Sequence, residues 1–201
     1  MAPGVIAAAA AAAERHKRIV IADRVWSAYA QAHGLHYRPG REGWARTEMP
    51  RLDGAVGNVA VALELVDDPW DPRAFVVAAL ARPVVPLVGH VEVHREGILS
   101  RIAEAFGAHD IAVGEDAFDR AFVVKATDES TARALLPPNV TRELLALGAK
   151  SFAYDDGSEN SQGAIVVANF PFQTEDFGPI DRALAFVALV AQIRPASGPY
   201  R

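Results

Sequence analysis

The sequence predicts an α+β protein with a mostly antiparallel mixed sheet and helices packed mainly on one face of that sheet. Two observations support this fold class. Segments rich in valine and leucine cluster in the first half of the chain, and short turns separate several of them. Parallel strands need long crossover connections, whereas antiparallel neighbours need only a turn, so this spacing favours antiparallel pairing.

Apolar periodicity predicts about five helices and about seven strands. Glycine or proline follows each predicted helix, and Asp128 is placed to cap the third one. Pro83 and Pro86 interrupt the sheet. The predicted helices are 18–33, 97–106, 129–136, 138–147 and the segment from Pro179 to the residues before Pro195. The predicted strands are 56–66, 74–81, 87–94, 121–126, 151–154 and 164–170, with a short strand after His109.

The chain of 201 residues is long enough for one large domain or two small ones. We expect residues 1–17 to form a disordered or frayed alanine-rich leader, residues 18–194 a single α+β domain, and residues 195–201 a tail. A weak repeat of a helix end, a glycine and a histidine leaves open two intimate subdomains that meet near residues 95–110.

Composition and motifs exclude several classes of function. The formal net charge is −5, which argues against a nucleic-acid partner, because phosphate backbones attract basic proteins. The chain has no cysteine, so disulfides, thiolate metal sites and a cysteine nucleophile are excluded. The sequence contains no GxxxxGK[ST], GxGxxG, HExxH or GxSxG motif. We therefore assign no cofactor and no catalytic residue.

Two short apolar runs, Val5–Ala13 and Ala183–Ala191, do not predict membrane spans, which need about 20 residues. The basic cluster at 15–18 follows the first run, whereas a secretory signal carries its positive charge before the apolar stretch. Arginine and alanine are abundant while lysine is scarce, which is typical of a GC-rich bacterial genome. We expect a soluble, cytoplasmic bacterial protein with no integral membrane segment.

His90, Glu92 and His94 form the best candidate site, because residues two apart in a strand point to the same face. Two imidazoles and a carboxylate are a possible metal ligand set. We expect the simpler arrangement, in which these side chains face solvent or a partner and bind no metal, while Val91 and Val93 fill the core. Three further histidines can join the site only if the fold brings them close: His33, His36 and His109.

The C-terminal helix is apolar on two sides. One stripe consists of Ile180, Leu184, Val187 and Ala191. The neighbouring stripe consists of Ala183, Phe186, Val190 and Ile193. A surface helix needs only one apolar stripe, so the second is buried inside the protein or meets another chain. Interior packing is the expected outcome, and a homodimer or another protein partner through this helix is the alternative.

The stretch AFDRAFVVKATDESTARALLPPNVTRELLAL, followed by FAYDDG, combines a phenylalanine-containing turn, a valine-rich strand, an Asp-led helix and a Leu-Leu-Pro break. In these features it resembles a family of uncharacterised bacterial domains, from Ala117 to about Phe170. Members of that family often carry membrane helices ahead of this domain, and we identify none here. The family offers no catalytic residues, so the resemblance implies a fold unit and not an activity.

These observations favour a non-catalytic binding or scaffold module. The alternative is a small metal-dependent enzyme that uses His90, Glu92 and His94.

Overall fold

Alternating apolar residues build one large sheet, and the computed structural model describes residues 3–42, 47–68, 74–96, 109–158, 163–171 and 177–194. The helices are α1 (Pro3–His33), α2 (Asp116–Asp119), α3 (Glu129–Leu135), α4 (Pro138–Ala146) and α5 (Gly178–Ala191). The strands are β1 (His36–Arg38), β2 (Arg41–Glu42), β3 (Thr47–Glu48), β4 (Arg51–Val56), β5 (Val59–Asp67), β6 (Phe75–Ala81), β7 (His90–Arg95), β8 (His109–Asp110), β9 (Phe122–Ala126), β10 (Ser151–Asp155) and β11 (Ile165–Pro171).

Within the described residues, nine strands form the main sheet in the order β1-β4-β5-β6-β11-β10-β7-β9-β8. Each pair of neighbours in this order is antiparallel. The two edge strands are short, with three residues in β1 and two in β8. Strands β2 and β3 form a separate small ribbon. The α+β fold class with an antiparallel sheet is therefore confirmed.

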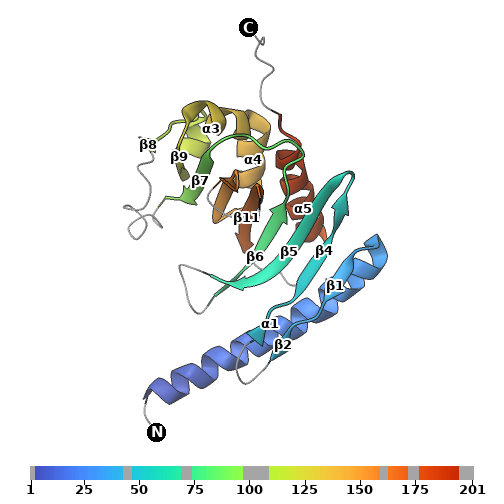
Figure 1. Cartoon of the computed structure of the whole chain (residues 1–201). Helices are drawn as coiled ribbons and strands as arrows, with labels where there is room; N and C mark the ends of the chain where they lie inside the picture. The colour runs from blue at the N-terminus through green and yellow to red at the C-terminus, as the bar shows by residue number, and fades with distance from the viewer. Residues whose placement is uncertain are drawn as a thin grey trace.

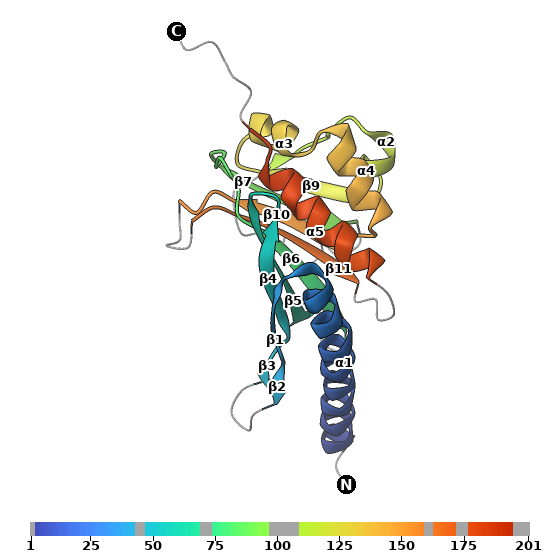
Figure 2. The same ribbon diagram turned by 90° about the vertical axis from the view of Figure 1, so that its right-hand side faces the viewer.

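The strand register separates the sheet into an apolar face and a mixed face. One row of directly opposed residues crosses six strands and is buried throughout: Leu63, Ala79, Ala168, Phe152, Val93 and Val124. The next row points the other way and is mixed: Glu64, Ala78, Asn169, Ser151, His94 and Val123. The helices lie on one side of the sheet, as Figure 2 shows, and they cover the apolar face.

Helix α5 is the main cover of the apolar face, and it packs against β4, β5, β6 and β11 as well as α4. Phe186 lies edge-on to both Phe152 and Phe170, with ring centroids 6.1 Å apart in each pair. Seven of the eight residues in the two predicted stripes are buried, and Ile193 is half-buried against the core. Both stripes are thus occupied by the protein's own core.

Helix α1 packs on the same side of the sheet through its C-terminal half. Trp26 is buried beside Val77, Phe170 and Ile180, and the Tyr29 hydroxyl donates to the Asp181 carboxylate at 2.6 Å. These contacts join α1 to the start of α5. The N-terminal half of α1 extends beyond the sheet (Figure 1).

Several elements differ from the sequence-based expectation, since β7 begins at His90 and not at Leu87, and β4 has no predicted counterpart. Helix α1 begins at Pro3 and not at Arg18. Alanine is the strongest helix former, and between Gly4 and Gly34 the sequence has no glycine or proline to break the helix. The strand expected over 56–66 is divided, because Gly57 adopts φ +60° and makes a two-residue turn between β4 and β5.

Some expectations concern residues outside the described part of the chain. The helix predicted over 97–106 and the tail at 195–201 both fall there. The division into leader, domain and tail stays a prediction. Among the helices described, none combines the length and the apolar character needed to cross a membrane.

Phe186→Asp tests the central position of α5. We expect it to lower the free energy of unfolding by about 4 kcal/mol or more, because it removes a buried ring and places an unpaired charge in the core. Leu189→Asp, on the exposed side of the same helix, should cost less than about 1 kcal/mol. Urea unfolding followed by circular dichroism measures both, and equal shifts in the two variants would contradict this packing.

Candidate functional site

The three polar residues of β7 do share one face, and they form a bridged ion-pair cluster. The Nε2 atom of His90 lies 3.1 Å from Oε1 of Glu92, and Nε2 of His94 lies 3.2 Å from Oε2. Each carboxylate oxygen thus faces one imidazole. Val91 and Val93 are fully buried on the opposite face, which confirms that part of the prediction.

The cluster shifts the pKa values of its members in opposite directions. Hydrogen bonds from His90 and His94 hold the pKa of Glu92 far below its ordinary value, despite partial burial. The hydrogen bond to Glu92 raises the pKa of His90, and the nearby carboxylates of Asp155 and Asp156 add to this effect. Lys125 of β9 stands directly opposite Glu92 in the register. The cluster therefore favours a charged Glu92 and a protonated His90.

The expectation that all three side chains face solvent or a partner does not hold for His94, which is only 8% exposed. It lies on a central strand, with Ser151 of β10 and Val123 of β9 directly opposite it on either side. Within the described residues, no group of three or more histidine or acidic side chains is arranged to hold a metal ion. Metal binding by His90, Glu92 and His94 was not expected from the sequence, and it gains no support from this geometry.

The other histidines do not join this cluster. His33 lies at the end of α1, where its ring stacks on Tyr29 at 4.0 Å. His36 is on the edge strand β1, at the far side of the sheet from β7. The register pairs His109 of β8 with Ala126 of β9, and β8 is separated from β7 by β9.

A different feature stands out from the side-chain exposures, namely the loop of residues 82–89 between β6 and β7, called here the β6–β7 loop. Five large apolar side chains are exposed among the described residues. Three of them lie in this loop: Val84, Val85 and Val88. Leu189 on the exposed side of α5 is a fourth. In the sequence, Pro83 and Pro86 indicate only that the sheet is interrupted here. The local pattern does not predict that the loop exposes apolar side chains.

Beyond Arg82, whose N–H donates to the carbonyl of Ala60 at 3.2 Å, the backbone of the loop is held at four points. The Tyr154 hydroxyl accepts from Leu87 N–H and donates to Leu87 C=O, both at 2.7 Å. Burial raises the pKa of Tyr154, which keeps this hydroxyl protonated. Val84 N–H donates to the carbonyl of Ala191 at the end of α5, at 2.8 Å. The Thr131 hydroxyl of α3 donates to the carbonyl of Val88, also at 2.8 Å.

The fourth anchor is at Gly89, where the loop enters β7. Gly89 N–H donates to the Asp156 carboxylate at 2.7 Å. Gly89 adopts φ +112°, and a Cβ atom there would lie 2.9 Å from the Thr127 hydroxyl. Both the backbone conformation and the lack of space require glycine at this position. The loop is therefore fixed on both sides of Val88.

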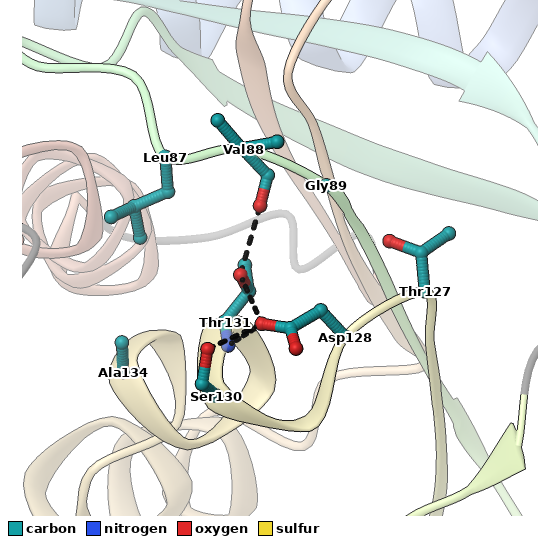
Figure 3. Close-up of a pocket in the computed structure, with 8 residues that line it drawn as sticks. All are labelled: Leu87, Val88, Gly89, Thr127, Asp128, Ser130, Thr131 and Ala134. Carbon is teal, nitrogen blue, oxygen red and sulfur yellow. Dashed lines mark hydrogen bonds between the residues drawn. The ribbon is translucent and has the colours of Figure 1, made fainter.

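An open pocket of about 650 Å³ lies between this loop and α3 (Figure 3). Asp128 caps α3 as the sequence predicts, with its carboxylate accepting from Thr131 N–H at 2.8 Å. The hydroxyl of Ser130 also donates to this carboxylate. The pocket is lined by Leu87, Val88, Gly89, Thr127, Asp128, Ser130, Thr131 and Ala134.

The fold and this surface define an α+β protein with one covered sheet face and an apolar loop at the end of its C-terminal helix. No family model and no curated protein matches the chain. Among solved structures, the fold is similar to that of the mycobacterial trehalose monomycolate transport factor A, TtfA, with a TM-score of 0.58 and 13% identity. The match covers 88% of this chain and 98% of that one, and it shows the fold alone. The resemblance to an uncharacterised bacterial family stays a prediction.

Tyr154→Phe tests the anchoring of the loop. It leaves a buried N–H and a buried C=O of Leu87 unpaired, so we expect a loss of about 1–3 kcal/mol in the free energy of unfolding. Hydrogen exchange of the loop amides should accelerate in native conditions. Tyr29→Phe, a buried tyrosine that bonds the exposed Asp181, is the control and should leave loop exchange unchanged. Unchanged exchange in Tyr154→Phe would show that the hydroxyl does not hold the loop.

The His–Glu cluster predicts a pH-dependent contribution to stability. Because the pKa of Glu92 is lowered, Glu92 stabilises the folded state above pH 4.5, its ordinary pKa. Because the pKa of His90 is raised, His90 stabilises the folded state most fully below pH 6.5, its ordinary pKa. The contribution is lost as pH rises through the folded-state pKa of His90. Glu92→Gln should therefore destabilise the protein more at about pH 5.5 than at about pH 8.5 in urea unfolding.

Glu129→Gln is the matched control for the pH series, because Glu129 pairs with Arg133, a group that stays protonated at both pH values. Its cost should be the same at the two pH values. A Glu92→Gln cost that does not change with pH would mean that His90 does not titrate against Glu92.

Proposed function

We propose that the protein is a non-catalytic binding or scaffold module that presents the β6–β7 loop to a protein partner. One observation carries the proposal: Val88 is 84% exposed, although the backbone on both sides of it is fixed by Tyr154, Thr131 and Asp156. A valine that is held out into water by its own fold is a feature that folding stability does not require.

The exposed side chains near Val88 support the same conclusion. Val84 and Val85 are 39% and 37% exposed, and Leu189 is 39% exposed near the C-terminal end of α5, where Val84 is anchored. Monomeric proteins rarely expose clustered large apolar side chains, and such clusters mark interaction sites. The C-terminal helix thus offers a partner its outer side next to the loop, since its two stripes are filled by the core.

The fixed backbone also favours binding. A flexible loop loses conformational entropy when a partner orders its backbone, at a cost of about 1–2 kcal/mol for each residue that is fixed. The four anchors impose that order before binding. The loop therefore has the properties of a preformed contact surface.

The comparison with solved structures agrees loosely with this proposal. TtfA is named as a transport factor, which fits a binding or scaffold role only loosely. At 13% identity the likeness is one of fold, so the proposal rests on the exposed loop and not on this neighbour.

Val88 and Val20 provide a matched test, because both are exposed valines and Val20 lies on α1, away from the loop. A photoreactive amino acid is placed at either position in the protein expressed in its native cells. We expect a discrete crosslinked protein from position 88 that is absent from position 20. The partner is then identified by mass spectrometry and purified.

Calorimetry with that purified partner completes the test. Val88→Ser should weaken binding about tenfold or more, because burying a valine contributes about 1.5–3 kcal/mol, whereas Val20→Ser should have no effect. A self-crosslink accompanied by a dimer in light scattering would identify a second copy as the partner. Equal crosslinking from the two positions would refute the proposal.

A further inference from the structure

We propose that the pocket beside Val88 binds a protein segment in which a lysine or arginine stands next to an apolar side chain. This inference rests on the proposed function and specifies the chemistry of the partner. It follows from the two halves of the pocket, which differ in character and lie side by side in Figure 3.

The apolar half is formed by Leu87 and Val88 of the loop and Ala134 of α3. The pocket, at about 650 Å³, has room for more than one side chain, and pockets of about 300–1,000 Å³ are typical of ligand sites. Val88 itself stands mostly outside the pocket, in solvent. A polypeptide segment, the occupant that the proposed function calls for, can cover Val88 with one side chain and enter the pocket with the next.

The polar half carries negative charge. Asp128 is the one charged residue among the eight that line the pocket, and its hydrogen bonds from Ser130 and Thr131 lower its pKa and keep it ionised. Asp156, which follows β10 and accepts from Gly89 N–H, also has a lowered pKa because it accepts hydrogen bonds from Ser158 and Gly89. Asp128 therefore attracts a cation into the pocket, and Asp156 adds negative charge on the other side of β7.

The nearby positive charges do not cancel this attraction, because His90, which follows Gly89, is paired with Glu92 at 3.1 Å. Arg133, on the next turn of α3, is paired with Glu129 at 2.7 Å. The start of a helix carries at most about half a positive charge, and α3 is short, so the full charge of Asp128 prevails. The hydroxyls of Thr127 and Ser130, on the same side of the pocket, can bond the main chain of an incoming segment.

Capped hexapeptides test this chemistry without knowledge of the natural partner. The probe is GLRLRG, with GLQLQG as the neutral control and GLELEG as the charge-reversed control, each titrated into the full-length protein at low salt. Amide chemical shifts of Gly89, Thr127 and Ser130 report binding. We expect GLRLRG to shift these amides, GLQLQG to bind about two- to fivefold more weakly, and GLELEG not to bind.

Asp128→Asn is the decisive variant, because asparagine caps a helix as well as aspartate does and so α3 is preserved while the charge is removed. It should reduce the affinity for GLRLRG to that for GLQLQG. Asp116→Asn, at the exposed start of α2 and outside the pocket, is the control and should leave the affinity unchanged. Val88→Ser should weaken all binding.

The outcomes separate this inference from the proposed function. If GLRLRG binds the wild type and Asp128→Asn equally, or shifts none of the three amides at millimolar concentration, the basic-segment inference fails. In that case a partner crosslinked at position 88 would still support the proposed function. A larger species in light scattering that Val88→Ser abolishes would make a second copy the occupant and would also overturn the inference.

Discussion

The packing of α5 across the apolar face of the sheet is the contact on which the other parts of the structure depend. Phe186 fills the space between Phe152 of β10 and Phe170 of β11, so one helix holds strands from the later part of the chain. The same helix contacts β4, β5 and β6 from the earlier part. Both ends of α5 also make contacts. The carboxylate of Asp181 accepts a hydrogen bond from the Tyr29 hydroxyl of α1, and the carbonyl of Ala191 accepts one from Val84 N–H of the loop.

The two faces of the sheet differ in the side chains that they carry. The covered face buries large apolar side chains in register, which is where the hydrophobic contribution to stability arises. The other face carries small and polar residues, and its polar groups pair with one another across or along the strands. Asn169 bonds Ser151 at 2.8 Å, and Glu92 lies between His90 and His94. Partial burial is tolerated there because these groups have partners.

Local pattern was sufficient for the features that depend on neighbouring residues. The buried Val91 and Val93 follow from strand alternation, and the cap at Asp128 follows from helix chemistry. The turn at Gly57 was missed because valines continue the alternation on both sides of it. The loop was missed for another reason, because its bonds come from Tyr154 and Thr131, which are 67 and 43 residues away from Leu87 and Val88. Such contacts depend on the tertiary fold.

The shortness of the edge strands has a consequence for how this protein associates. An exposed sheet edge can recruit an extra strand from another chain, the route to β-augmentation and to fibrillar aggregation. Here β1 and β8 end the described sheet with three and two residues, and Arg38 of β1 is held by Asp53 at 2.7 Å. So few main-chain groups give an incoming strand little to pair with. A partner of the proposed kind would therefore be recognised through side chains and not through backbone pairing, and side-chain recognition is more selective.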